Sequence, residues 1–186
     1  MQGHTNIEIG TIRAEEWNLF LRLAAAEGWQ VPQQETALFR GAFADNAFAL
    51  RSSGDPYGFI TALCHVHNGW IGNLLVAEGY RGRGYGSALL DHALRSLREC
   101  GACCVWLTAS AFGRPLYERR GFSLIDGVDR WAREGEGVSA PAAISVVDAE
   151  AVVAADARAW GGSRTHLLQH LTINGQAYSG GASLAL

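Results

Sequence analysis

A glycine-rich segment stands directly between a predicted strand and a predicted long helix, and it limits the folds open to this chain. The segment GYRGRGYG fills positions 79–86, after an apolar run ending at Val76. From Ala88 to Leu97 apolar residues recur at helical spacing. Glycines at the start of a helix let the backbone approach a ligand, and the unpaired N–H groups with the helix dipole favour a phosphate. For the hexamer RGRGYG at 81–86 taken alone, a tight turn that binds nothing is an equally good explanation.

The neighbouring patterns predict an α/β fold with a mixed, mostly antiparallel sheet. Before the glycine segment we expect a strand near residues 7–12, helices at 17–24 and after Pro32, and strands at 47–51, 57–67 and 70–76. The second helix carries its apolar side on Ala37, Leu38, Phe39 and Phe43, and Asn68-Gly69 is predicted as a two-residue hairpin turn. The last three strands of this group therefore form a meander.

After the long helix we expect a strand at 103–109, buried on both faces because it is almost continuously apolar. A short helix at 112–120 and a final hairpin from Gly121 through Trp131 follow. The predicted order is βααβββαβαββ, with helices flanking the central sheet. This order excludes a doubly wound parallel sheet.

The charged residues exclude several classes of function. All 15 basic residues are Arg, so every mechanism that needs a lysine is excluded, including the P-loop phosphate site and Schiff-base chemistry. The formal net charge is −3, yet residues 81–133 hold nine Arg against five acidic residues. A local basic stretch in an acidic protein favours a compact anionic ligand and argues against a nucleic acid, which needs a broad basic face.

The chain shows no pattern of a membrane or secreted protein. No run approaches 18 apolar residues, and the first ten residues lack a signal pattern, so we expect a cytoplasmic protein with no membrane partner. The four cysteines are too few and too bunched for a disulfide framework. Cys64 points away from His65 and His67 in a strand, and we assign no metal.

Two motifs resemble the GNAT superfamily of N-acetyltransferases. Leu74-Leu75-Val76 followed by Arg81-x-x-Gly84-x-Gly86 and a long helix is similar to its acyl-CoA binding motif. Residues 116–122, LYERRGF, are similar to its second motif at about the usual distance. With the strand order, the resemblance covers roughly residues 6–133 and implies the GNAT fold.

The resemblance implies where acetyl-CoA binds. The backbone N–H groups of Arg83 to Ser87 would cradle the pyrophosphate, and the fourth and fifth strands would splay apart to admit the pantetheine arm. The family commonly has an Asn seven residues before the motif Tyr, and Ser110 stands there in this chain. The cofactor-binding set that it implies is Leu74, Leu75, Val76, Arg81, Gly82, Arg83, Gly84, Tyr85, Gly86, Ser87, Ser110 and Tyr117.

Catalysis needs an acid for the leaving thiolate and a base for the acceptor ammonium. Tyr117 resembles the family's acid, and packing on the cofactor wall is the alternative role. His65 and His67 share one face of a predicted strand and could act as the base near neutral pH, or they are ordinary sheet histidines. Glu35, on the second helix, is a competing candidate.

The predicted function is transfer of an acetyl group from acetyl-CoA to an amine of a small molecule or protein, by direct attack in a ternary complex. The alternative is a CoA-binding sensor or interaction module on the same fold with no turnover. The expected partners are acetyl-CoA and the amine acceptor, and a homodimer is a further candidate.

The end of the chain is predicted as a separate segment. We divide the chain into an acetyltransferase domain at 1–133, a linker at 134–142 and a C-terminal extension at 143–186. The extension has a strand near 144–147, an N-cap at Asp148, and helices at 149–160 and 163–171. It resembles the start of a second acetyltransferase-like lobe. It is too short to bury its apolar face alone, so we expect it to lie against the first lobe or another subunit.

Overall fold

The structure is a computed structural model, and it describes residues 7–129, 145–147, 149–172, 177–180 and 183–185. The chain divides into two compact units, residues 1–122 and 123–186, and each is described by itself. Within the described segments, no helix is both long and apolar enough to span a bilayer.

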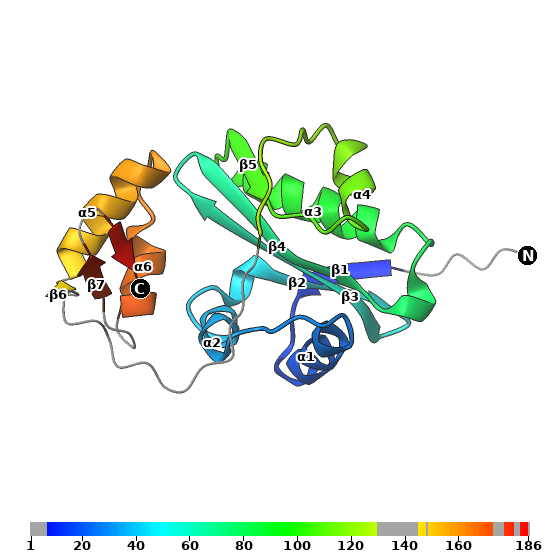
Figure 1. Ribbon diagram of the computed structural model, residues 1–186. Coiled ribbons are helices and arrows are strands. Elements are labelled where there is room, and N and C mark those ends of the chain that lie inside the picture. Colours follow the sequence, from blue (N-terminus) through cyan, green and yellow to red (C-terminus); the bar gives the residue numbers. More distant parts are fainter. Residues whose placement is uncertain (1–6, 130–144, 148, 173–176, 181–182, 186) are drawn as a thin grey trace, which may run out of the picture. The chain divides into compact units, whose positions relative to one another are not determined.

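The first unit is a five-stranded mixed sheet with helices on both faces (Figure 1). The strands lie in the order β1-β2-β3-β4-β5, all antiparallel except β4 and β5, which are parallel. Helices α1 and α2 cover one face, and α3 and α4 cover the other. This arrangement confirms the predicted mixed α/β fold class. The elements are β1 (Ile7–Thr11), η1 (Ala14–Glu16), α1 (Trp17–Ala26), α2 (Gln33–Arg40), η2 (Ala44–Asn46), β2 (Ala47–Ser52), β3 (Asp55–His65), β4 (Asn68–Val76), η3 (Glu78–Tyr80), α3 (Tyr85–Glu99), β5 (Cys104–Leu107) and α4 (Arg114–Glu118).

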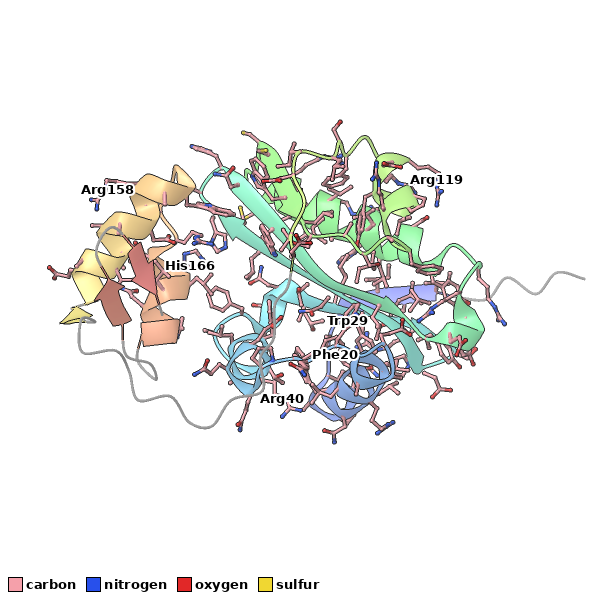
Figure 2. All side chains as sticks on the ribbon, viewed as in Figure 1. Phe20, Trp29, Arg40, Arg119, Arg158 and His166 are labelled. Atoms are coloured by element: carbon pink, nitrogen blue, oxygen red, sulfur yellow. The ribbon has the colours of Figure 1, made fainter. Side chains whose placement is uncertain are left out.

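The core lies on both faces of the sheet because β2 and β3 are internal strands. Successive side chains of a strand point to opposite faces, so Phe48 and Leu50 pack in the cluster that contains Leu89 and Leu90 of α3. On the other face, Phe20 of α1 meets the Phe59 ring edge-on with centroids 5.6 Å apart. Figure 2 shows Phe20 between its helix and the sheet.

Two strand glycines let α3 lie close to the sheet. A Cβ at Gly58 would come within 2.8 Å of Leu89 Cδ1, and a Cβ at Gly69 would come within 2.8 Å of Leu97 Cδ1. Gly69 is thus a packing residue inside β4. The predicted Asn68-Gly69 turn is wrong by two residues, because His65 pairs with Asn68 and the two-residue turn is Val66-His67.

Three further predictions differ from the structure. Strand β5 is an edge strand within the described sheet, so Trp106 is 37% exposed and the strand is not buried on both faces. The predicted final hairpin is absent from residues 121–129, and residues 130–131 lie outside the described part. On the predicted apolar side of the second helix, Phe39 is buried as expected, and so is Phe43 beyond the helix end, but Ala37 is exposed and Thr36 is buried in its place.

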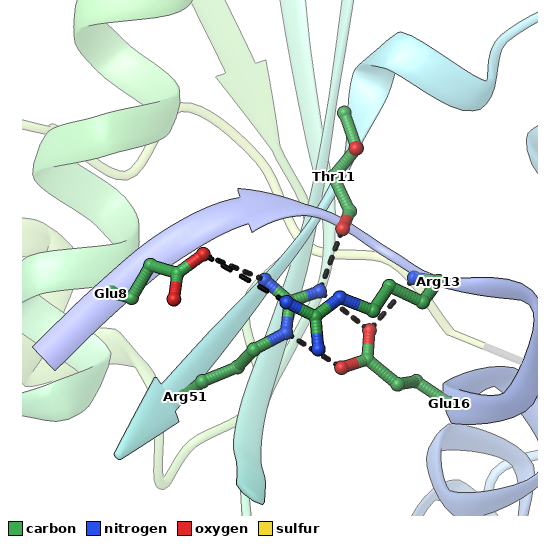
Figure 3. A network of polar contacts seen from close by, with 5 residues as sticks. All are labelled: Glu8, Thr11, Arg13, Glu16 and Arg51. Atoms are coloured by element: carbon green, nitrogen blue, oxygen red, sulfur yellow. Dashed lines mark hydrogen bonds and ion pairs between the residues drawn. The ribbon is translucent and has the colours of Figure 1, made fainter. Parts of the chain in front are cut away.

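A buried ion pair ties β2 to the start of α1 (Figure 3). Arg51 donates from Nε to Glu16 Oε1 and from Nη2 to Oε2, both at 2.6 Å, and both side chains are at most 5% exposed. Arg51 also donates to the Thr11 carbonyl at 2.7 Å. Burial alone would raise the pKa of Glu16, but the hydrogen bonds from Arg51 and from the Arg13 N–H outweigh it and leave this pKa below its ordinary value.

The described residues of the second unit form three strands and two helices. They are β6 (Ser145–Val147), α5 (Ala149–Trp160), α6 (Thr165–Thr172), β7 (Ala177–Gly180) and β8 (Ser183–Ala185). The strands are antiparallel in the order β6-β7-β8. The predicted strand and both helices are confirmed, while the N-cap predicted at Asp148 lies outside the described residues.

Candidate active site

Strand β4 continues past the end of its parallel partner β5. Their parallel pairing runs from Asn68 with Cys104 to Ile71 with Leu107 and goes no further in the described sheet. From Gly72 to Val76, β4 therefore pairs with β3 on one side, and in the described sheet no strand covers its other edge. We call the edge of β4 that lies beyond β5, from Gly72 to Val76, the opening between β4 and β5, with its apex at the Ile71 end and its wide end at the glycine segment.

The glycine segment turns the chain into α3 with left-handed backbone at two positions. Gly82 has φ of 74° and Gly84, the N-cap of α3, has φ of 84°. No side chain caps this helix, and its first intrahelical bond is from Ala88 N to the Gly84 carbonyl. The N–H groups of the first turn, Tyr85 to Ser87, therefore precede the helix ladder, and such groups at a helix start favour an anion.

The two arginines of the glycine segment contact the residues around it. Arg81 donates from Nε to the Val76 carbonyl at 2.9 Å, forms an ion pair with Glu27 at the end of α1, and lies over the Phe112 ring. Arg83 donates to the Gly79 carbonyl at 3.1 Å and stacks on Tyr80. These two side chains thus fix the shape of the loop.

Of the remaining residues predicted to hold the cofactor, some lie at the opening and others are buried in the core. Leu74 and Val76 are half-buried at the opening, whereas Leu75 and Tyr85 are buried. Tyr85 can therefore offer only its backbone to a ligand. The hydroxyl of Ser110 accepts a hydrogen bond from Gly113 N at 3.1 Å, which orders the turn before α4.

Helix α4 brings Tyr117 to the start of α3. Leu116 Cδ2 lies 3.5 Å from the position that a Cβ on Gly86 would take. Tyr117 is 9% exposed and meets the Phe122 ring at a centroid distance of 6.0 Å. Burial raises the pKa of Tyr117 to about 12, so the phenol keeps its proton at neutral pH.

The structure separates the three predicted base candidates. His67 is exposed in the hairpin turn, so it does not share a strand face with His65, and that prediction is wrong. His65 is 2% exposed at the end of β3, four residues beyond Thr61, or about 13 Å along the strand. Glu35 instead reaches β4 beside the apex of the opening, where Asn73 Nδ2 donates to its Oε1 at 2.8 Å.

Asn73 is a site residue that the sequence analysis missed. It sits at a β-bulge in β4, between the pairs Gly72–Thr61 and Leu75–Phe59, with φ of 54°. Asn tolerates left-handed backbone better than other residues with a side chain. A Gly-Asn dipeptide inside an apolar strand pattern is the signal that could have revealed the bulge.

In the described part of the chain, no three His, Cys, Asp or Glu side chains are grouped so as to hold a metal ion. The polar groups at the opening include backbone N–H donors, the Glu35 carboxylate with the Asn73 amide, and the buried phenol of Tyr117. This set suits an acyl transfer between a phosphate-bearing donor and an amine.

Comparison with known proteins identifies the family. The sequence model described as "Acetyltransferase (GNAT) family" matches residues 11–122. No curated protein sequence matches the chain.

Solved structures share the fold. A protein from Pyrococcus horikoshii classed as an acetyltransferase is 18% identical with a TM-score of 0.72, over 96% of this chain and 65% of its own. A GCN5-related N-acetyltransferase from Ralstonia eutropha JMP134 is 23% identical with a TM-score of 0.53, over 68% of this chain and 99% of its own. Ard1 from Thermoplasma volcanium is 23% identical with a TM-score of 0.58, over 64% and 84%. The chain thus spans 65% of the length of the Pyrococcus protein.

Proposed function

This chain belongs to the acetyltransferase (GNAT) family, and we propose that it transfers an acetyl group from acetyl-CoA to an amine by direct attack in a ternary complex. One observation carries the proposal. The opening between β4 and β5 has a helix N-terminus with uncapped N–H groups at its wide end and a carboxylate beside its apex. These two features match the two ends of an acyl-CoA, the phosphates and the thioester.

The cofactor would be held mainly by backbone. The N–H groups from Arg83 to Ser87 would bind the pyrophosphate, which the positive end of the α3 dipole also favours. The pantetheine arm would hydrogen-bond the edge of β4 between Gly72 and Val76, a length of about 13 Å, where β5 no longer pairs with it. Backbone N–H groups of β4 at the apex end of this edge, where the thioester would lie, would stabilise the oxyanion of the tetrahedral intermediate.

Glu35 is the general base of this proposal. It is the one predicted base candidate that contacts β4 beside the apex of the opening, through Asn73. A carboxylate there attracts the ammonium form of the acceptor and accepts its proton. The freed lone pair then attacks the carbonyl carbon of the thioester.

Tyr117 is the general acid. As the tetrahedral intermediate collapses, the C–S bond breaks and the sulfur takes the electron pair, while the Tyr117 hydroxyl gives its proton to the thiolate. The nitrogen of the intermediate still carries an extra proton and releases it to solvent as the intermediate collapses. The products are therefore the acetylated amine, CoA and one proton, and solvent exchange returns the proton from Glu35 to Tyr117. The raised pKa of Tyr117, about 12, keeps the phenol protonated before each turnover.

The test is release of free thiol from acetyl-CoA with a panel of primary amines. We expect turnover with at least one amine, and Glu35→Gln should lower kcat by on the order of 10²-fold or more, as loss of a general base does. Glu15→Gln, an exposed glutamate in η1, is the matched control. Binding of acetyl-CoA without turnover of any amine would favour the sensor or interaction module instead.

A further inference from the structure

We propose that Asn73 is a positioning residue that holds the Glu35 carboxylate in one orientation for proton transfer. This inference rests on the proposed function, because it deepens the role of Glu35 in that site. Three residues from three elements carry it, Glu35 of α2, Thr61 of β3 and Asn73 of β4.

The side-chain amide of Asn73 is held by both of its hydrogens. Nδ2 donates to Glu35 Oε1 at 2.8 Å and to Thr61 Oγ1 at 3.3 Å. A carboxylate only accepts hydrogen bonds, so the nitrogen and not the oxygen of the amide must face Glu35. Thr61 is 4% exposed and forms the fixed end of this chain of contacts.

The β-bulge is what brings Asn73 to Glu35. Gly72 pairs with Thr61, and directly opposed residues share a face of the sheet. In a regular strand the next residue would point to the opposite face, where α3 packs. The left-handed backbone at Asn73 turns its side chain back to the face of Thr61 and α2. Gly72 leaves space for the Asn73 side chain beside Thr61, because a Cβ at position 72 would lie 3.1 Å from Thr61 Oγ1.

The consequence is a carboxylate with one oxygen fixed and one available. Among the described residues, Asn73 is the donor to Glu35 Oε1, and none donates to Oε2. Fixing Oε1 removes rotation of the carboxylate and directs Oε2 to the acceptor amine. A misplacement of about 1 Å in such a group costs on the order of 10² in rate, so the amide should affect kcat and leave acetyl-CoA binding unchanged.

The first arm of the test needs no activity. Asn73→Asp keeps the size and the tolerance of left-handed backbone but places a second carboxylate against Glu35. We expect the melting temperature to fall by on the order of 2–4 °C. The double variant Glu35→Gln/Asn73→Asp restores a donor and an acceptor with their roles exchanged, and it should recover most of this loss. Glu15→Gln/Asn73→Asp, with an exposed glutamate changed, should not recover it.

The second arm measures kinetics. Asn73→Gly keeps the left-handed backbone and removes the amide, so we expect kcat to fall by about 10- to 100-fold with the KM for acetyl-CoA unchanged. In the Glu35→Gln background the same change should cost nothing further, because Asn73 acts through Glu35. If the loss of kcat in the double variant equals the product of the losses in the two single variants, the inference is overturned.

The two arms also separate this inference from the proposed function. No recovery of melting temperature in Glu35→Gln/Asn73→Asp, with normal wild-type turnover, overturns the positioning role alone. Thermal recovery without wild-type turnover overturns the proposed function and, with it, a role for Asn73 in catalysis.

Discussion

The two units of the chain begin with the same order of elements, yet the site lies in only one of them. The first unit starts β1-α1-α2-β2-β3, and the second runs β6-α5-α6-β7-β8, each with its three strands adjacent and antiparallel. The first unit continues into β4, the glycine segment, α3, β5 and α4. Asn73, Gly84 and Tyr117 all lie in that continuation, while Glu35 lies in the shared part.

This difference shows which half of the fold makes a site. The shared half provides a sheet, its covering helices and one carboxylate. The continuation provides the bulge that engages this carboxylate, the opening between parallel strands, and the helix N-terminus. A strand-helix-helix-strand-strand unit alone therefore lacks the groups that an acyl-CoA needs, and we expect ligand effects to arise in the first unit.

The most complete expected loss concerns the glycine segment, where the whole response to the ligand should disappear. Gly84 has φ of 84° and Gly86 lies against Leu116, so Gly84→Val and Gly86→Val should both block the approach of the pyrophosphate to the backbone. Acetyl-CoA should stabilise the wild type by mass action, about 2.7 kcal/mol at 100 times its Kd, and the variants should lose this stabilisation. Thermal denaturation with and without acetyl-CoA measures it.

Gly79→Ala is the matched control for these variants. Gly79 has ordinary backbone, and no atom lies within 4 Å of the position that a Cβ would take there, so its replacement should leave the acetyl-CoA response intact. An unchanged response in both valine variants would contradict the pyrophosphate assignment and, with it, the contrast between the two units.

The next effect concerns the buried ion pair of the first unit. Glu16→Gln removes the buried partner of Arg51, which is 2% exposed, and leaves it only the 4.0 Å contact with the exposed Glu8 as an ion pair. Breaking a buried pair from one side typically costs about 3–5 kcal/mol of the free energy of unfolding. Chemical denaturation measures the loss, and Glu15→Gln, exposed on the same turn, is the control. A loss under about 1 kcal/mol would contradict the structural role of the pair.

The Glu16–Arg51 pair also makes the stability of the first unit depend on pH in the acid range. The pKa of Glu16 is lowered in the folded protein, so its carboxylate stabilises the fold above the pKa of the unfolded chain. This stabilisation is lost as the pH falls from about 4.5 through the lower folded value. In Glu16→Gln the free energy of unfolding should therefore change less with pH in the acid range than it does in the wild type. Chemical denaturation at about pH 3–6 measures this difference.

Local patterns predicted the elements of the first unit well, and packing between elements decided where the prediction was wrong. Helical periodicity placed α1 and α3 correctly, because their apolar faces repeat over several turns. The dipeptide Asn68-Gly69 was misleading, since Gly69 is required by the contact of α3 with β4. A sequence pattern does not distinguish a glycine needed for a turn from one needed for close packing.

The candidate site was predictable in its backbone part and less so in its side chains. The glycine segment is recognisable because left-handed backbone at Gly82 and Gly84 restricts the residue type. The contact of Glu35 with Asn73 joins residues 38 positions apart, and it depends on a bulge that reverses the face of one side chain. The period-two rule placed His65 and His67 on one face, but that rule fails once the strand ends at His65.

A smaller effect concerns the general acid. Tyr117→Phe keeps the ring that packs with Phe122 and removes the hydroxyl, so we expect kcat to fall on the order of 10²-fold with acetyl-CoA affinity nearly unchanged. Tyr85→Phe, also buried in the core on α3, is the control. Because the pKa of Tyr117 is raised to about 12, wild-type kcat should show no alkaline loss from this group below about pH 11. Equal losses of affinity and rate would mark Tyr117 as a packing residue instead.

The smallest effect tests the second unit. Arg164 donates from Nε to Asp156 Oδ2 at 3.1 Å and stacks on the Trp160 ring at 4.2 Å, and the two charged side chains are 26% and 15% exposed. An ion pair that reaches solvent contributes about 0–1 kcal/mol, and Asp156→Asn leaves the contact with Trp160 in place. We therefore expect a loss below about 1 kcal/mol by chemical denaturation, with the acetyl-CoA response unchanged. A change in that response would contradict the assignment of the site to the first unit alone.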